Sequence, residues 1–514
     1  MLKTIRILLS VLSLLAVTLL FLDFTGTAQR LWPWMAKIQF FPALLSANIL
    51  VIVGLVAATL LLGRVYCSVI CPMGIFQDVV SWVHGRVMGK KKRRVRFRYT
   101  PGKRVRHIVL GVFLALVAIG LFGGLAMAIA GLVEPYSAYG RIAQQIFAPA
   151  YDGANNLLAD WSASRPNNYM FYKVAYAVSI PLLIVAIVTL GVVGVMAWRG
   201  GRDYCNTICP VGTLLGYMSR YSLLKPVIDT SKCVKCGLCG RGCKAKCIDT
   251  KAHKIDYSRC VACMDCISIC NDGAIRYTWR RPKSEAVDTG RRPTSTKEAR
   301  ELASRRGFMM ASGLVVASVA FEGMAKTDGG FTPLKAKRTH ERQVPVVPAG
   351  AQGLKHLRQH CTGCQLCVQS CPSKILKPTL GLDGFMQPHL DFTSGFCPTD
   401  CVVCSSVCPV GAFHAVDEVQ KSSIKVGRAQ VNLAACLSAS EGVKCGSCAS
   451  HCPAGAIMMV EAEEGNGRLM PIVNDALCIG CGACEYHCPV GTLASQDAES
   501  SAIYVEGIER HRMI

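Results

Sequence analysis

Residues 361–372 of the chain read CTGCQLCVQSCP, and residues 478–489 repeat the same spacing as CIGCGACEYHCP. This spacing, C-x2-C-x2-C-x3-C-P, is the run whose thiolates hold 4Fe–4S clusters. Three close cysteines bind one cluster, and the fourth binds the other cluster of a pair. Two spacing variants lie between these runs, and both also end in Cys-Pro. The four groups are Cys361, Cys364, Cys367 and Cys371; Cys397, Cys401, Cys404 and Cys408; Cys436, Cys445, Cys448 and Cys452; and Cys478, Cys481, Cys484 and Cys488.

Zinc is the main competing explanation for these groups. Zinc sites use similar spacings, but they usually occur as isolated tetrads rather than as four quartets that each end in Cys-Pro. A disulfide framework would not need so local a repeat. We therefore interpret the four groups as iron–sulfur ligands.

The bulk composition indicates a membrane protein with several parts. The chain has 514 residues, 29 cysteines, 51% hydrophobic residues and a formal charge of +24, and its length predicts about three domains. Residues 327–514 carry 15 Lys and Arg against 17 Asp and Glu, so the positive excess lies in the first 326 residues. Positive charge beside apolar segments is typical of cytoplasmic loops of membrane proteins. Nucleic-acid binding is therefore not expected.

Residues 1–222 are predicted to form a membrane domain. Apolar stretches at about 5–23, 40–63, 107–133 and 172–198 are long enough to cross roughly 30 Å of hydrocarbon. Residues 90–106, between the second and third stretches, carry ten Lys and Arg and should stay cytoplasmic. This arrangement predicts four transmembrane helices with the N-terminus in the cytoplasm.

The membrane domain contains an internal repeat. Residues 63–74 read GRVYCSVICPMG and residues 201–212 read GRDYCNTICPVG, both expected at cytoplasmic membrane ends. C-x3-C places two thiols on one helical face, and a pseudo-two-fold axis would bring the pairs together. They could then hold an additional iron or iron–sulfur centre, or serve as structural or redox thiols. The four candidate ligands are Cys67, Cys71, Cys205 and Cys209.

Residues 223–280 are predicted to form a cytoplasmic two-cluster domain. By the crossing rule, one cluster takes Cys233, Cys236, Cys239 and Cys270, and the other takes Cys260, Cys263, Cys266 and Cys243. Cys247 is left over. It could replace Cys243, although the x3 spacing favours Cys243.

The chain is expected to cross the membrane again in its middle. Residues 281–306 are a polar linker that ends in Ser304-Arg305-Arg306-Gly307-Phe308-Met309, which resembles a twin-arginine export motif. The apolar run that follows, within residues 307–325, has the length of a signal or anchor helix. A tether (326–354) and a periplasmic four-cluster domain (355–514) follow. The alternative is an ordinary fifth helix anchored by two arginines, and cleavage of the segment is left open.

These motifs resemble a known family. The first 280 residues resemble NapH-type membrane ferredoxin-like proteins, which are related to the NosR and CcoG groups. Residues from about 304 onward resemble NapG/MauM-type four-cluster proteins. The expected fold is an α-helical membrane domain, with four transmembrane helices plus a signal-anchor-like helix, and two α+β bacterial-ferredoxin-like domains.

The resemblance also implies how the outer cysteine groups pair. It implies that group one pairs with group four and group two with group three, although spacing alone would also allow neighbours to pair. The implied ligand sets are Cys361, Cys364, Cys367 and Cys488; Cys478, Cys481, Cys484 and Cys371; Cys397, Cys401, Cys404 and Cys452; and Cys436, Cys445, Cys448 and Cys408.

With six clusters, the resemblance implies electron transfer from membrane quinol to a periplasmic reductase or cytochrome at the bacterial inner membrane. Glu134 is a candidate quinol proton acceptor. Two alternatives remain: a conduit from a cytoplasmic ferredoxin or flavoprotein to the periplasm, and a CcoG-like metal reductase or maturation factor. Any conduit must bridge roughly 30 Å of hydrocarbon, through a quinone or a centre between the faces.

Overall fold

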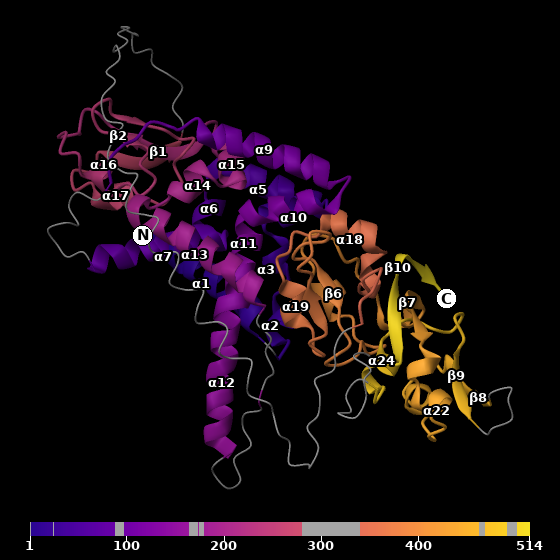
Figure 1. The fold of residues 1–514 in the computed structure, drawn as a ribbon. Helices are drawn as coiled ribbons and strands as arrows, with labels where there is room; N and C mark the ends of the chain where they lie inside the picture. The colour runs from indigo at the N-terminus through magenta and orange to yellow at the C-terminus, as the bar shows by residue number, and fades with distance from the viewer. Residues whose placement is uncertain are drawn as a thin grey trace, which may run out of the picture.

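The computed structural model of the chain describes residues 2–23, 25–87, 97–163, 173, 179–279, 340–461, 468–490 and 501–514. The predicted linker, the twin-arginine-like motif, the helix at 307–325 and most of the tether lie outside these residues. Two cysteine-rich parts lie at opposite ends of a helical part (Figure 1). We call them the inner module (residues 223–279) and the outer domain (residues 340–514).

Two helices of the helical part, α1 (Leu2–Leu22) and α13 (Ile180–Gly200), are long and apolar enough to cross a membrane. The other two predicted spans are interrupted. The stretch 40–63 forms α4 (Phe40–Leu45) and α5 (Ile49–Leu62), and the stretch 107–133 forms α9 (Val105–Gly120) and α10 (Gly124–Val133).

The break between α9 and α10 has a steric cause. A Cβ on Gly120 would lie 2.8 Å from the backbone nitrogen of Met127, so glycine allows the chain to fold back tightly at residues 121–123. The two helices then pack side by side (Figure 1). A single continuous helix over 107–133 was therefore a wrong prediction.

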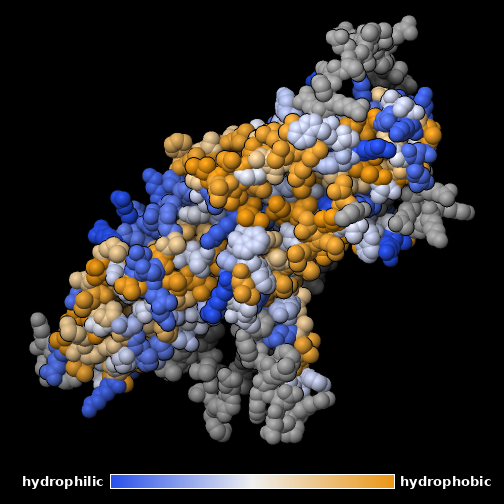
Figure 2. All heavy atoms as spheres, turned by 180° about the vertical axis from the view of Figure 1, so that it is seen from behind, coloured by the Kyte–Doolittle hydropathy of each residue, from blue (hydrophilic) through white to orange (hydrophobic). Residues whose placement is uncertain are grey.

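The shorter helices of this part surround the two repeated motifs. They are α2 (Thr27–Leu31), α3 (Trp34–Lys37), α6 (Tyr66–Val69), α7 (Pro72–Val87), α11 (Pro135–Ile142), a π-helical turn at Ala143–Phe147, α12 (Ala148–Ala163), α14 (Asp203–Thr207) and α15 (Pro210–Ser219). Apolar side chains of α1, α5, α9 and α13 remain exposed. Figure 2 shows them as an apolar surface over the middle of the molecule. Such a surface is expected to face lipid or a partner.

The inner module is an internally repeated α+β arrangement. It contains β1 (Leu224–Ile228), α16 (Leu238–Gly242), β2 (Ile248–Asp249), β3 (Lys254–Ile255), α17 (Asp265–Ile269) and β4 (Ile275–Trp279). β1 pairs antiparallel with β4, and β2 with β3. Each short helix carries the third cysteine of one run.

The outer domain is built from short helices and antiparallel strand pairs. Its strands are β5 (Leu376–Pro378), β6 (Pro388–Leu390), β7 (Ile424–Val431), β8 (Ile457–Glu461), β9 (Leu469–Val473) and β10 (Ile503–Met513). Its α-helices are α18 (Leu354–His360), α19 (Leu366–Ser370), α20 (Val403–Val407), α21 (Glu418–Ser422), α22 (Leu437–Ser440), α23 (Ser447–Ser450) and α24 (Ala483–His487). The strands pair as β5–β6, β7–β10 and β8–β9.

The outer domain packs directly on the helical part. α18 contacts α10, and α19 contacts α1. Ser137 donates a hydrogen bond to Thr362 at 2.8 Å. A Cβ on Gly131 would lie 2.3 Å from the carbonyl oxygen of Thr362. Only glycine permits this approach, so the junction depends on backbone contact as well as on side chains.

Candidate iron–sulfur sites

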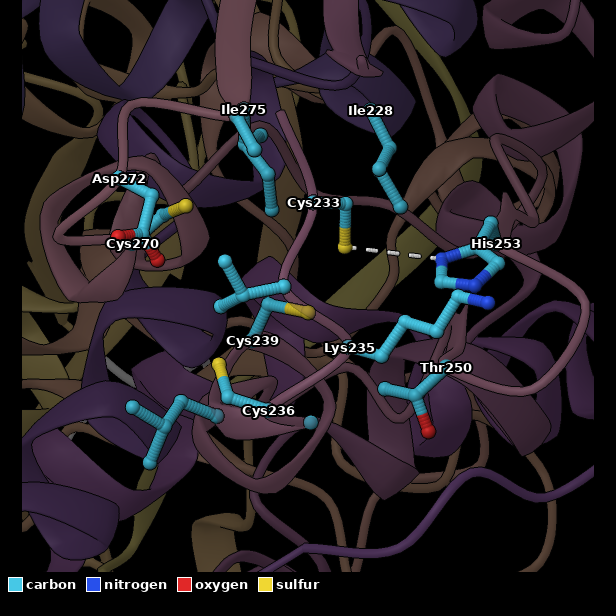
Figure 3. Close-up of a pocket in the computed structure, with 14 residues that line it drawn as sticks. Ile228, Cys233, Lys235, Cys236, Cys239, Thr250, His253, Cys270, Asp272 and Ile275 are labelled. Carbon is cyan, nitrogen blue, oxygen red and sulfur yellow. Dashed lines mark hydrogen bonds between the residues drawn. The ribbon is translucent and has the colours of Figure 1, made fainter. Parts of the chain in front are cut away.

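The first inner site matches the expected ligand set. Its four thiols line one cavity, and Figure 3 shows them gathered around a common space. His253 lies 3.7 Å from the sulfur of Cys233 through Nδ1, a contact that can orient the ligand. Cys236 is exposed, so this site lies at the molecular surface. The four thiols are Cys233, Cys236, Cys239 and Cys270.

The second inner site includes the leftover cysteine. Cys247 is buried, and its sulfur lies 3.5 Å from that of Cys243. It also interacts with Cys260. The spacing argument considered Cys247 only as a replacement for Cys243, so it did not predict that both thiols lie in the same site. The thiols lining this second cavity are Cys243, Cys247, Cys260, Cys263 and Cys266.

The two repeated motifs meet in the core of the helical part. Each of their four thiols is only 3% exposed. Arg64 donates to the carbonyl of Cys205 at 3.3 Å, and Arg202 donates to the carbonyl of Cys67 at 2.6 Å. Each motif thus holds the other by the same contact, as a pseudo-two-fold axis requires. We call this set the central quartet: Cys67, Cys71, Cys205 and Cys209.

Glycine leaves room for these two arginine–carbonyl hydrogen bonds. A Cβ on Gly74 would lie 2.3 Å from the carbonyl oxygen of Cys67 and 2.8 Å from Arg202. Gly212 meets Cys205 and Arg64 in the same way. The final glycine of the GRxYCxxICPxG repeat therefore lets each arginine reach across.

The central quartet is surrounded by positive charge. Arg64 and Arg202 are buried, and a guanidinium nitrogen of each lies 3.8 Å and 4.0 Å from the sulfurs of Cys67 and Cys205, respectively. Gln77 also donates to the sulfur of Cys205, at 3.1 Å. Both arginines occur at the same position of the repeat, so the sequence indicates their role at the quartet. Gln77 could not be predicted in this way, because the equivalent residue of the second copy is Leu215.

Asp78 neutralises only one of these arginines. It forms ion pairs with Arg202 at 2.7 Å, Arg6 at 2.9 Å and Lys244 at 3.0 Å. Burial alone would raise the pKa of the Asp78 carboxyl, but the charges of Arg202 and Lys244 outweigh it and hold this pKa well below its usual value. Arg64 has no carboxylate partner among the described residues. Its buried charge therefore favours an anionic occupant.

The thiol spacing argues for clusters rather than single ions. Among the described residues, no three His, Cys, Asp or Glu side chains converge closely enough to hold one metal ion. A four-iron cluster binds each thiolate to a different iron, which holds the sulfurs further apart. The donor set of the central quartet, four thiolates near two buried guanidinium groups, fits such an anionic cluster.

In the outer domain, the cysteines of neighbouring groups lie close together, which differs from the pairing that the resemblance implies. Cys408 of group two acts electrostatically on Cys361, Cys364 and Cys367. Cys371 of group one acts in turn on Cys397 and Cys404. Groups one and two therefore exchange their fourth cysteines.

Groups three and four exchange theirs as well. Cys452 lines one cavity with Cys478, Cys481 and Cys484, while Cys488 acts on Cys448. Cys488 was expected with group one and Cys408 with group three, and the structure places neither there. The physical reason lies in the packing of the domain: each fourth cysteine follows a short helix, and the fold places it beside the adjacent run.

The sites follow one another through the molecule. Arg64 contacts the central quartet and also donates to the carbonyl of Ser258, two residues before Cys260. On the other side, Tyr204 donates to the carbonyl of Val133 at 2.8 Å, two residues from the contact between Gly131 and Thr362. Within the outer domain, the backbone nitrogen of Cys397 donates to the carbonyl of Cys481 at 3.0 Å.

Glu134 does not have the surroundings of a quinol base. Its side chain is 1% exposed, and its carboxylate caps α11 by accepting from the backbone nitrogens of Tyr136 and Ser137. A carboxylate occupied in this way is a helix cap.

Comparisons with known proteins agree with a cluster-binding chain. The 4Fe-4S binding domain family matches residues 45–95, 181–229 and 401–418, so it includes both halves of the central quartet. The 4Fe-4S dicluster domain family matches residues 443–492, which contain cysteines of groups three and four. No solved structure matches the chain.

The chain is similar over part of its length to three known proteins, two of which are named as electron-transport or ferredoxin-type proteins. An uncharacterised protein of Methanocaldococcus jannaschii is 40% identical over 75 residues, 15% of this chain and 30% of the relative. The putative electron transport protein YccM of Escherichia coli is 22% identical over 235 residues, 45% and 55% of the two chains. The ferredoxin-type protein NapH of Haemophilus influenzae is 24% identical over 227 residues, 42% and 63%. The chain thus spans less than two thirds of each of these relatives.

The sites and the family matches define an iron–sulfur electron-transfer protein. Within that class, the chain is similar to NapH/NosR-like ferredoxin-type electron transport proteins.

Proposed function

We propose that this protein relays electrons across the bacterial inner membrane, from the inner module through the central quartet to the outer domain and on to a periplasmic reductase or cytochrome. In this proposal the chain holds seven 4Fe–4S clusters, six in the two cysteine-rich parts and one at the central quartet. When bound, the clusters supply one-electron chemistry. The polypeptide spaces them, excludes water and provides the charges that tune them.

The position of the central quartet carries the proposal. It is buried between the inner module and the outer domain. Arg64 connects it to the inner module, and Tyr204 connects it to α10, on which the outer domain packs. A relay between two cysteine-rich parts needs an intermediate site in this position. A maturation factor would not need one.

The proposed topology follows from the same arrangement. α1 and α13 would cross the membrane with two further spans built from the shorter helices. The C-terminal domain would lie in the periplasm, and the inner module in the cytoplasm.

The surface of the first inner site favours a soluble cytoplasmic donor. Among residues 223–279, six exposed side chains are basic and two are acidic. Lys232 and Lys235 flank the exposed part of this site. Such a surface attracts an acidic carrier such as a ferredoxin or flavodoxin. The six basic residues are Lys232, Lys235, Arg241, Lys251, Lys254 and Arg276.

The test is rapid reduction of the anaerobic, cluster-loaded full chain in lipid vesicles by an acidic bacterial flavodoxin. We expect the double variant Lys232→Glu/Lys235→Glu to slow this reduction by about tenfold at low salt, and less as salt is raised. Lys37→Glu, at an exposed position of α3, is the matched control. Unchanged rates in the double variant would remove the soluble-carrier proposal.

Quinol is the second candidate donor, because the family resemblance implies it and because apolar helix surfaces are exposed beside the relay. Reduction of the clusters by a quinol analogue, with flavodoxin ineffective, would establish this alternative. Failure of both donors, with all clusters present, would contradict the relay itself.

A further inference from the structure

Tyr136 is an unusual side chain at the junction between the helical part and the outer domain. It is the second residue of α11 and is fully buried. Its hydroxyl group has no hydrogen-bond partner among the described residues. An unpaired buried hydroxyl group destabilises the fold, so its position calls for an acceptor that the described part of the polypeptide does not supply.

The surroundings of Tyr136 identify where that acceptor would be. The thiols that act electrostatically on its phenol are Cys364 and Cys408, both members of the ligand set built from groups one and two. The next residue, Ser137, donates a hydrogen bond to Thr362, which follows Cys361. This contact holds α11 against the cysteines of group one.

The other neighbours of Tyr136 do not satisfy its hydroxyl group. The ring of Phe21 packs with its centroid 6.0 Å away and offers no oxygen or nitrogen. The carboxylate of Glu134 accepts from backbone nitrogens instead.

We propose that Tyr136 donates a hydrogen bond from its hydroxyl group to the 4Fe–4S cluster held by Cys361, Cys364, Cys367 and Cys408. This inference rests on the cluster occupancy in the proposed function. A hydrogen bond to a thiolate or sulfide stabilises the reduced cluster more than the oxidised one, since reduction adds a negative charge. The helical part would thus tune the first cluster of the outer domain.

The test compares Tyr136→Phe with Tyr139→Phe in the cluster-loaded full chain. Tyr139 lies one turn further along α11, is 2% exposed, and its hydroxyl group is bonded to Thr18 at 2.6 Å. In a redox titration followed by EPR, Tyr136→Phe should shift the equilibrium of one cluster about tenfold toward the oxidised form. Tyr139→Phe should shift none. The affected signal is the one lost in Cys408→Ala.

A second measurement separates a hydrogen bond from a packing effect. In D2O, pulsed EPR of the wild type should show an exchangeable deuteron coupled to this cluster, and Tyr136→Phe should lose that coupling. Equal shifts in both variants, no shift in either, or a coupling that persists in Tyr136→Phe would overturn the inference and leave the proposed function standing. Absence of 4Fe–4S signals from the wild type would instead overturn the proposed function.

Discussion

The pairing of the outer cysteine groups can be tested by combining substitutions. Cys361→Ala removes a ligand of one cluster, so it should cost about four irons out of roughly 28 per chain. In the structure, Cys408 belongs to the same set as Cys361, and adding Cys408→Ala should cost nothing further. Cys488 belongs with Cys448, and adding Cys488→Ala should cost about four more irons. The two double variants should therefore retain roughly 24 and 20 irons.

The assay is iron and acid-labile sulfide in anaerobically purified full chain, read as a double-mutant cycle. Gly54→Ala serves as a control, because a Cβ at this position meets nothing within 4 Å. EPR signals of the inner module should persist in every variant, which shows that the chain still folds. If Cys361→Ala/Cys488→Ala retained more iron than Cys361→Ala/Cys408→Ala, the neighbour pairing would be refuted and the pairing implied by the resemblance would be restored.

Three further predictions concern the helical part. Asp78→Asn removes the carboxylate of the buried Arg202 and one of the two carboxylates of Lys244. It should therefore lower the free energy of unfolding in detergent by about 3–5 kcal/mol, whereas Asp203→Asn, at a more exposed pair, should cost at most about 1 kcal/mol. Because the folded-state pKa of Asp78 is depressed, the difference in unfolding free energy between the wild type and Asp78→Asn should stay constant between about pH 5 and 8. It should shrink only as the pH falls toward that pKa. Loss of this difference at neutral pH would contradict the ion-pair assignment. Gly131→Ala should overpack the junction, which lowers the free energy of unfolding by about 1–3 kcal/mol and accelerates hydrogen exchange in α18 and α19. Gly54→Ala is the control: its added Cβ meets nothing within 4 Å, so hydrogen exchange should not change. Serine at all four positions of the central quartet (Cys67, Cys71, Cys205 and Cys209) should remove about four irons and stop reduction of the outer clusters by donors to the inner module. Normal reduction of the outer clusters would show that electrons do not pass through the quartet.

The sequence predicted the short-range features of the sites well. Cysteines two residues apart lie close together along the chain, and the cysteines of each predicted inner ligand set line a common cavity, with Cys247 beside the second set. The repeat predicted that Cys67 and Cys205 would meet, because two copies of one motif tend to associate symmetrically. Neither argument required knowledge of how distant elements dock.

Features that depend on distant packing escaped the sequence. Residues 107–133 are continuously apolar, so their length predicts one transmembrane helix. The helix break depends instead on the close approach of Gly120 to Met127. The partner of each fourth cysteine depends on which run its turn faces. Tyr136 carries no motif, and its unpaired hydroxyl group is evident only once α11 is seen against the outer domain.

The contacts along α1 bear on the membrane gap that the proposed conduit must bridge. At one end Lys3 pairs with Asp265 of the inner module at 3.0 Å, and at the other end Phe21 packs beside Tyr136 at the junction with the outer domain. At 1.5 Å per residue, these contacts are about 27 Å apart, close to the thickness of the hydrocarbon core. Ser13, between them, donates to the carbonyl of Ile70, next to Cys71.

Ser13 lies about 15 Å from the inner contact and about 12 Å from the outer one along α1, so Cys71 of the central quartet lies beside the middle of this helix. Each motif directly follows a helix of a predicted span, α5 or α13, and its position relative to the membrane faces stays a prediction. In the proposed relay, a site beside the middle of α1 would divide one distance that is too long for direct transfer into two shorter ones. Val133 and Gly131 are about 3 Å apart along α10, so in the proposed relay the outer half of the path would cross only this helix. The break at Gly120, which a hydropathy plot cannot show, places α10 there. The proposed relay would then need no mobile carrier between its two ends.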